Sequence, residues 1–248
     1  MAPEPVTILQ PRGGSYPSVL AEGRSLYPRV RIGRPGQARS YWPMVALMRA
    51  LRVRWAVQIL GRERVAAGAG IIIANHVSAV DPVAVVMSTW WRVTAFTKVE
   101  AFQSRGGLFF RIMGQIPLRR GDEAATDWAL VMATQALRRG GKIGLYPEGT
   151  RSPDPGRLHK LHKRILVPLL QANPDVPVHA LTTSYARRGW RRTRVQVRVS
   201  APLALDPAKL TAEELTVAVR EALLELGGQT YVDRYAHDVK RDRQPHAG

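Results

Sequence analysis

Short apolar runs alternate with amphipathic segments along most of the chain. Residues 71–74 form a continuous apolar run, the pattern of a strand buried on both faces of a sheet, and residues 142–146 predict a second strand of this kind. Further strands are predicted at residues 93–98, 115–118, 176–184 and 194–199, helices at 82–89, 127–139, 165–172 and 212–226, and a helix or apolar coil at 108–113. This alternation predicts an α/β fold, with a mostly parallel, mixed sheet flanked by helices.

The two ends of the chain depart from this pattern. Residues 1–40 are rich in Pro, Gly and Arg and show no clear apolar periodicity, so we expect a loose basic arm there. Residues 41–61 mix Trp, Met and Leu with arginines and predict one N-terminal amphipathic helix, which either anchors at a membrane interface or packs in the core. We therefore place the main domain at residues 41–235 and a charged, frayed tail at residues 236–248.

The composition narrows the classes of function. The 248 residues contain 37 basic and 19 acidic side chains, a net charge of +18, and such a field attracts nucleic acid, anionic membranes or phosphorylated substrates. Cysteine is absent, which excludes a thiolate nucleophile, a disulfide and a Cys-ligated metal site. The chain shows no secretory signal and no apolar run long enough to span a membrane, so we expect it in the cytoplasm or on the cytoplasmic face of the cell membrane.

A polar cluster directly follows the first buried strand. Asn75 and His76 come after the apolar run, and Asp81 precedes Pro82 in the arrangement of a helix N-cap. Ligand sites in open α/β sheets lie at the carboxyl ends of strands, which places His76 where chemistry is expected. If the chain turns between them, Asp81 can fix the imidazole tautomer and leave the other nitrogen to take a proton from a hydroxyl. The alternative is that Asp81 only caps the helix and His76 is an ordinary loop residue.

A second polar loop follows the strand at residues 142–146. It contains Glu148, Gly149, Thr150 and Arg151. Gly149 permits close approach of the backbone to a ligand, and Arg151 can bind a phosphate or carboxylate through two hydrogen bonds. Glu148 could hold that arginine or accept a hydrogen bond from a substrate hydroxyl. A plain turn with a surface ion pair is the alternative.

A third cluster ends the strand predicted at residues 115–118. Arg119 and Arg120 are adjacent there, and two arginines at the end of a strand suit an anionic ligand. The alternative is a solvated run of charge that leads into a turn.

These clusters, in this order and at this spacing, resemble the motif blocks of the glycerolipid acyltransferase family, the 1-acylglycerol-3-phosphate O-acyltransferases. Residues 75–82 look like its catalytic H-x-x-x-x-D block, residues 146–152 like its phosphate-binding block, and residues 114–120 like the block between them. The chain departs from the family pattern at Arg119, where an Asp is usual. It departs again at residues 161–164, where the family commonly has Phe-Lys-x-Gly.

The resemblance implies a glycerolipid acyltransferase-like fold and transfer of an acyl chain from acyl-CoA or acyl carrier protein to a lysophospholipid hydroxyl. The acceptor that it favours is 1-acylglycerol-3-phosphate, which would give phosphatidate. It implies His76 as the general base and Asp81 as the residue that orients it. The further residues that it places at the substrate are Asn75, Ser78, Lys98, Arg120, Glu148, Gly149, Thr150 and Arg151. It implies no metal and no cofactor beyond the cosubstrate, and an anionic membrane surface rather than nucleic acid as partner.

Other functions compete with this interpretation. The acceptor could instead be a lyso-aminolipid, a glycolipid or glycerol 3-phosphate, because acceptor choice depends on loops such as residues 153–164. In a different class, the chain could be a basic module that binds nucleic acid through the arginines and Trp of residues 187–192. A lipid-binding homologue without catalysis is the remaining alternative.

Overall fold

The fold is built on one twisted seven-stranded sheet. The computed structural model describes residues 14–51, 55–65, 67–89, 91–188 and 192–243. Its strands are β1 (Trp55–Leu60), β2 (Gly70–Ala74), β3 (Val93–Lys98), β4 (Ile116–Leu118), β5 (Lys142–Leu145), β7 (Val178–Arg188) and β8 (Arg192–Val199). They lie in the order β1-β8-β7-β2-β5-β3-β4, and all neighbours are parallel except the antiparallel pair β7–β8. The predicted mostly parallel, mixed sheet is therefore confirmed.

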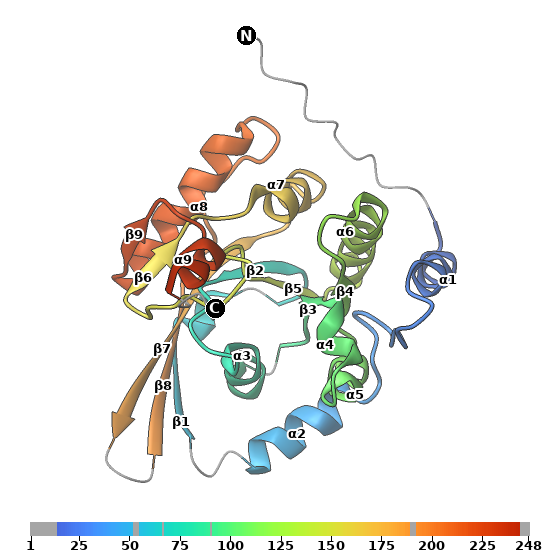
Figure 1. Cartoon of the computed structure of the whole chain (residues 1–248), viewed down its shortest axis with the longest axis horizontal. Coiled ribbons are helices and arrows are strands. Elements are labelled where there is room, and N and C mark those ends of the chain that lie inside the picture. Colours follow the sequence, from blue (N-terminus) through green and yellow to red (C-terminus); the bar gives the residue numbers. More distant parts are fainter. Residues whose placement is uncertain (1–13, 52–54, 66, 90, 189–191, 244–248) are drawn as a thin grey trace, which may run out of the picture.

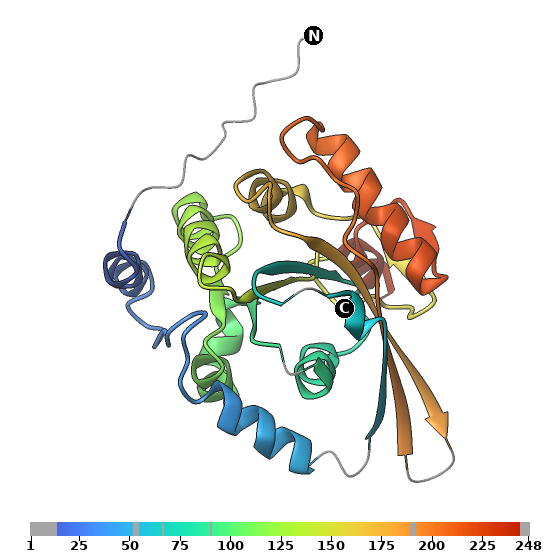
Figure 2. The ribbon, with the colours of Figure 1, turned by 180° about the vertical axis from the view of Figure 1, so that it is seen from behind.

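Helices cover both faces of the sheet (Figures 1 and 2). The helices are α1 (Tyr16–Leu26), α2 (Tyr41–Leu51), α3 (Asp81–Thr89), α4 (Val99–Gln103), α5 (Gly107–Ile112), α6 (Glu123–Leu137), α7 (Lys163–Gln171), α8 (Ala212–Gly227) and α9 (Ala236–Arg243), with a short 3₁₀ turn at Arg62–Arg64. One layer contains α6, α7 and α8, and α3 covers the other face with α2 beside it. A separate two-stranded parallel sheet pairs β6 (Arg157–His159) with β9 (Thr230–Val232).

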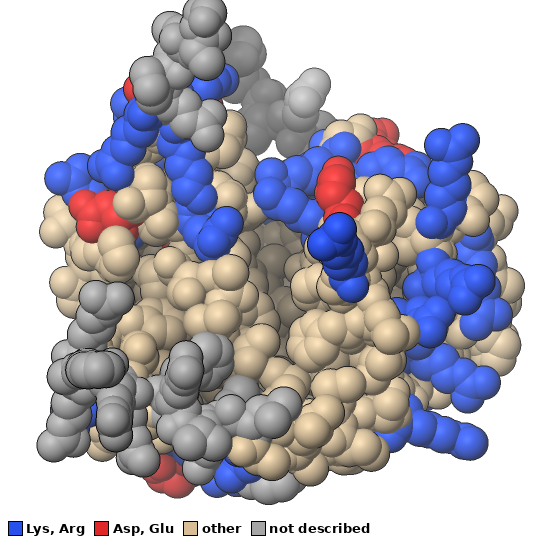
Figure 3. All heavy atoms as spheres, turned by 60° about the horizontal axis from the view of Figure 1, so that its bottom comes forward, with Lys and Arg blue, Asp and Glu red and all other residues tan. Residues whose placement is uncertain are grey.

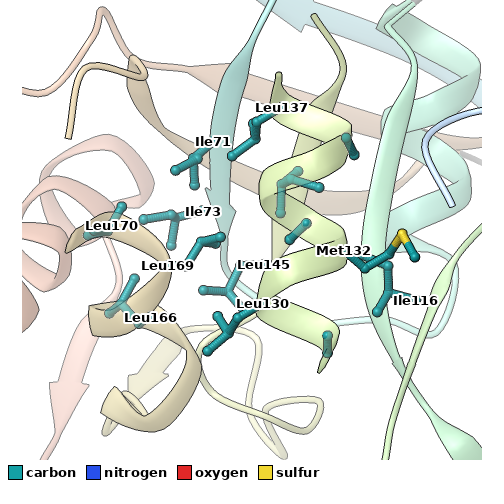
Figure 4. Packing of buried hydrophobic residues seen from close by; sticks show 14 of the residues in the cluster. Ile71, Ile73, Ile116, Leu130, Met132, Leu137, Leu145, Leu166, Leu169 and Leu170 are labelled. Carbon is teal, nitrogen blue, oxygen red and sulfur yellow. The ribbon is translucent and has the colours of Figure 1, made fainter. Parts of the chain in front are cut away.

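The central strand β2 is buried on both faces, as its continuous apolar run predicts. Ile71 and Ile73 point into the larger core, where they lie among the leucines of α6 and α7 (Figure 4). Ile72 and Ala74 point the other way and pack with α3 and the valines of β8. Alternate side chains of a strand face opposite sides of the sheet, so a strand between two helical layers must be apolar at every position.

The segment predicted as one helix at residues 41–61 forms two elements. The helix α2 ends at Leu51, and β1 pairs in parallel with β8 from Trp55 to Leu60. Within β1, Val57 and Ile59 pack against the core while Gln58 is exposed, the two-residue period of a strand. The prediction failed because apolar residues are so dense here that helical and strand periods both fit.

The expected loose arm contains a docked helix, and the expected frayed tail contains another. Ser15 caps α1, whose Tyr16, Val19, Leu20 and Gly23 are buried at the spacing of one helical face. Residues Tyr27, Val30 and Ile32 continue this contact with the core. At the other end, residues 236–243 form α9, while residues 1–13 and 244–248 lie outside the described part of the chain.

A substitution at Gly23 tests how tightly the first described helix is docked. A Cβ at Gly23 would lie 2.2 Å from ring atoms of Trp128 on α6, whose indole N–H donates to the Val19 carbonyl at 2.7 Å. We expect Gly23→Ala to lower the free energy of unfolding by about 1–3 kcal/mol through overpacking, although alanine favours helix formation. Urea unfolding measures the change. Gly106→Ala is the control, since its Cβ would meet no atom closer than 3.7 Å; equal stability of both variants would contradict the docking.

Candidate active site

The carboxyl ends of four parallel strands bring the predicted site residues together. Ile73 of β2 lies beside Leu145 of β5, so the loops that begin at Asn75 and Tyr146 leave the sheet at the same edge. Likewise Lys98, the last residue of β3, lies beside Leu118 of β4, which directly precedes the two arginines. Backbone contact joins the two main loops, because the Ser152 N–H donates to the His76 carbonyl at 2.6 Å. The segments singled out in the sequence thus form one site.

His76 and Asp81 form a hydrogen-bonded pair. The imidazole Nδ1 lies 2.9 Å from Asp81 Oδ2, with the carboxylate fully buried and the imidazole side chain 19 % exposed. The carboxylate accepts, so Nδ1 carries the proton and Nε2 keeps a free lone pair. The chain turns between the two residues as the interpretation required, and the free nitrogen can act as a base.

Asp81 is held by three donors besides the imidazole. Its Oδ2 accepts from the backbone N–H groups of Val77 and Ser78, each at 2.8 Å, and its Oδ1 accepts from the Tyr185 hydroxyl at 2.6 Å. Burial and the adjacent Asp81 charge raise the pKa of Tyr185, so the phenol stays protonated and donates. Asp81 also begins α3, so it is both the first residue of a helix and the partner of His76.

The imidazole lies against an aromatic ring. The ring centroids of His76 and Tyr146 are 4.6 Å apart with their planes tilted by 36°. Tyr146 follows β5 directly, and its phenol is deeply buried, which raises its pKa far above the ordinary range. This contact and the Asp81 hydrogen bond fix the position of the imidazole from two sides.

Glu148 connects the loop after β5 to the loop after β2. It is fully buried, and its two carboxylate oxygens accept from the backbone N–H groups of His76 (2.9 Å) and His159 (3.1 Å). Burial raises its pKa from the ordinary 4.5 to about 7, against the two N–H donors, which lower it. The carboxylate therefore holds the backbone at His76 in place. Arg151 is not its partner, and contact of Glu148 with a substrate hydroxyl stays a prediction.

Gly149 turns the loop at residues 146–152 through a left-handed backbone conformation. Its φ is 68°, and a Cβ there would lie 2.8 Å from the His162 ring. The carbonyl of Gly149 accepts a hydrogen bond from the Arg120 guanidinium. The loop after β4 and the loop after β5 are thereby joined.

Four cations gather around this loop. Burial, together with the nearby Arg120 and Arg151, lowers the pKa of Lys98, and burial with Arg151 and Lys98 lowers the pKa of Lys240. Among the described residues, none of these four side chains has a carboxylate oxygen within 4.0 Å. Like charges held close together without an ion-pair partner favour the binding of an anion.

The face shown in Figure 3 is hollowed near its centre. Lys and Arg lie above the hollow and to its right in this view, and uncharged side chains line the hollow itself.

The neighbouring arginines have different tasks. Arg120 reaches the loop, whereas Arg119 binds Asp122 at 2.9 Å and the Leu26 carbonyl at 3.1 Å, and its guanidinium lies 4.8 Å from the Tyr27 ring centroid. Arg119, where the chain departs from the family pattern, therefore contacts the docked N-terminal segment and not the site.

Two predicted substrate residues support the scaffold. The Asn75 amide is 2 % exposed, accepts from the Thr183 N–H at 2.8 Å and donates to Gln229 at 3.2 Å, so it joins β2 to β7. Ser78 donates its N–H to Asp81, and its hydroxyl accepts from the Val80 N–H at 3.4 Å. Contact of Asn75 or Ser78 with a substrate stays a prediction.

Sequence reasoning missed Tyr185 and Lys240. Tyr185 lies one residue beyond the strand predicted at residues 176–184, in phase with Thr183, and extending the strand would have found it. Lys240 lies in the predicted tail, and its Nζ is 3.4 Å from the Thr150 hydroxyl. No local pattern in the sequence marks it.

Comparison with known proteins agrees with this geometry. The Acyltransferase family model matches residues 56–184, just over half of the chain, and the chain belongs to this family, the glycerolipid acyltransferases. Among solved structures it is similar to the 1-acyl-sn-glycerophosphate (LPA) acyltransferase PlsC from Thermotoga maritima, with a TM-score of 0.55, 21 % identity and coverage of 82 % of this chain and 81 % of that chain. No curated protein matches the sequence significantly.

Two features are absent from the part of the chain that the structure describes. No helix in that part of the chain is long and apolar enough to cross a bilayer. Within the same ranges, no group of three or more His, Asp or Glu side chains is arranged to hold a metal ion.

The raised pKa of Glu148 predicts how stability depends on pH. Between about pH 4.5 and 7 the unfolded chain loses the Glu148 proton while the folded chain keeps it, so this residue lowers the free energy of unfolding as pH rises. The full effect is on the order of 3 kcal/mol. Urea unfolding at pH 4.5 and pH 8 should show that the wild type loses stability relative to Glu148→Gln by this order. The exposed Glu225→Gln serves as control, and parallel pH profiles for wild type and Glu148→Gln would contradict the assignment.

Proposed function

We propose that the protein transfers an acyl chain from a thioester, acyl-CoA or acyl carrier protein, to the free hydroxyl of 1-acylglycerol-3-phosphate, giving phosphatidate. The observation that carries this proposal is the hydrogen-bonded His76–Asp81 pair, which lies beside the four-cation cluster at the carboxyl end of the sheet. A base beside an anion site is what acylation of a phosphate-bearing alcohol requires. The chain's membership of the Acyltransferase family supports the reaction class.

The reaction follows from the free imidazole nitrogen. His76 Nε2 removes the proton from the acceptor hydroxyl as its oxygen attacks the thioester carbonyl. The tetrahedral intermediate collapses to the ester, its C–S bond breaks, and the protonated imidazole returns the proton to the departing thiolate. Asp81 keeps the Nδ1 proton in place and stabilises the imidazolium between these steps. The Val77 and Ser78 N–H groups are bound to Asp81, so they are engaged in positioning it.

The cation cluster accounts for the choice of acceptor. Arg120 and Arg151 can each bind a phosphate oxygen through paired N–H donors, and Lys98 and Lys240 add point charges. A bound phosphate would hold the glycerol hydroxyl at a fixed distance from the imidazole, because the loop of Arg151 is bonded to the His76 backbone. A lyso-aminolipid or glycolipid acceptor without a phosphate would leave these charges without a partner.

We propose an anionic membrane surface as the partner that delivers the lipid, on the cytoplasmic face of the cell membrane. Leu47 on α2 and Leu108 on α5 are 51 % and 56 % exposed, and the residues around them on both helices pack in one small core. Exposed Arg39 and Arg105 precede the two helices. Apolar side chains flanked by arginines suit insertion at an interface of anionic lipids.

Replacing the imidazole tests the proposed function. His76→Ala should lower kcat for lysophosphatidate acylation by about 10²-fold or more, because no other base lies in hydrogen-bond contact with Asp81 in the described structure. The assay follows transfer from labelled acyl-CoA to a panel of lysolipids and glycerol 3-phosphate. The melting temperature and vesicle binding of the variant are the controls for folding. Full activity in a folded variant would overturn the proposed mechanism.

A charge on the apolar patch tests the membrane surface. Leu47→Asp should weaken binding to phosphatidylglycerol-containing vesicles by about tenfold, since it removes buried apolar area and adds repulsion. Ala201→Asp adds the same charge at an exposed position after β8, at the opposite edge of the sheet, and should change binding much less. Cosedimentation measures both. Equal binding of the two variants would locate the membrane contact elsewhere.

A further inference from the structure

The segment that ends in α9 is attached to the loop at residues 146–152 and to the residues that follow it. β9 pairs with β6 from Thr230 to Val232, and the Lys160 N–H donates to the Arg234 carbonyl at 3.1 Å. Arg243 donates to the Pro153 carbonyl at 3.2 Å. These contacts attach the segment to residues 153–160, which directly follow the loop, and so set its position relative to Thr150.

A stack of three rings completes this attachment. The ring centroids of His162 and Tyr235 are 4.3 Å apart and the rings are nearly parallel, and the His237 ring lies 5.8 Å from His162 and 5.6 Å from Tyr235. His162 is the residue that a Cβ on Gly149 would meet, and its N–H donates to the Pro147 carbonyl at 2.8 Å. The stack therefore connects α9 directly to the turn that carries the cations.

Lys240 is the charged residue of α9 that faces the loop. Its Nζ lies 3.4 Å from the Thr150 hydroxyl, and no described carboxylate oxygen lies within 4.0 Å of it. Its neighbour Arg241 is 75 % exposed and pairs with Asp238 at 3.3 Å. The two adjacent cations thus differ in their surroundings: one has its counter-charge on the helix and the other points into the site.

We propose that Lys240 is a specificity-determining residue of the acceptor site, which makes the site select a phosphomonoester dianion over a singly charged phosphodiester. This inference rests on the proposed function, and it assigns a substrate contact to a residue outside the matched range of the family. A phosphomonoester carries about −1.5 to −2 charges at pH 7. Each cation around it therefore contributes up to twice the attraction that it gives to a phosphodiester.

The electrostatics of the cluster agree with a site completed by an anion. Burial, Arg151 and Lys98 all lower the pKa of Lys240, against the weaker effect of Glu148. A dianion bound among the four cations would offset the repulsion between them. Lysine supplies a compact charge with rotatable donors, which complements the planar donor sets of Arg120 and Arg151.

Substitution of Lys240 tests the proposal. Lys240→Gln should raise KM for lysophosphatidate by about tenfold or more with kcat within about twofold, because the lost contact holds the headgroup and not the reacting atoms. Isothermal titration calorimetry should show Kd for phenyl phosphate rising by about tenfold and Kd for diphenyl phosphate by about threefold or less. Lys240→Arg keeps the charge and should restore both constants to within about threefold of the wild type.

Arg241→Gln is the matched control, since it removes the same charge from the same helix, and it should leave KM and both dissociation constants unchanged. Equal weakening of the monoester and the diester by Lys240→Gln, or unchanged binding of both, would overturn the proposal. The melting temperature separates a loss of folding from a loss of contact, and Lys240→Met provides a second neutral side chain if the Gln variant unfolds. Direct binding of phenyl phosphate does not depend on turnover, so this test remains valid even if His76→Ala retains activity and the proposed reaction fails.

Discussion

The buried carboxylate of Asp81 is the interaction on which the site depends. It accepts from the His76 imidazole, from two backbone N–H groups of its own loop and from the Tyr185 hydroxyl of β7. A buried carboxylate is costly unless such donors satisfy it, so the loop, the helix start and the neighbouring strand are held in one geometry. The position of the base is therefore a consequence of the folding of the loop, and Glu148 fixes the same backbone from the loop that follows β5.

The parallel sheet converts separated segments of sequence into one site. Four loops leave the strands at the same edge, so the base, its carboxylate and three of the four cations come from consecutive strand ends. The fourth cation, Lys240, is held by the β6–β9 pair and by the ring stack. A reaction that needs an imidazole and a headgroup site at a set spacing is well served by loops anchored on one rigid sheet.

Strong local patterns made much of the fold predictable. The run at residues 71–74 and the capping box at Thr211 gave β2 and α8 nearly at their observed bounds, and the resemblance of the motif blocks led to the glycerolipid acyltransferase family. The remainder depends on distant contacts. β1 is a strand because β8 pairs with it, and residues 16–32 are docked because their apolar side chains pack in one core with Trp128 and its neighbours. Likewise, the sequence does not reveal that Lys240 lies beside Thr150. The strand β9, which positions this segment, has only three residues and is too short to show a strand pattern.

The pairing of β1 with β8 has a kinetic consequence. Trp55 pairs with Thr193, and such a long closed loop makes this contact slow to form during folding. The β7–β8 hairpin closes locally and can form first, leaving the outer edge of β8 open until β1 arrives. Along that edge Arg194 and Arg198 alternate with inward-facing valines, and charges on an open strand edge disfavour pairing with another chain. The arginines that add to the net charge of this protein thus also disfavour aggregation while this edge is open.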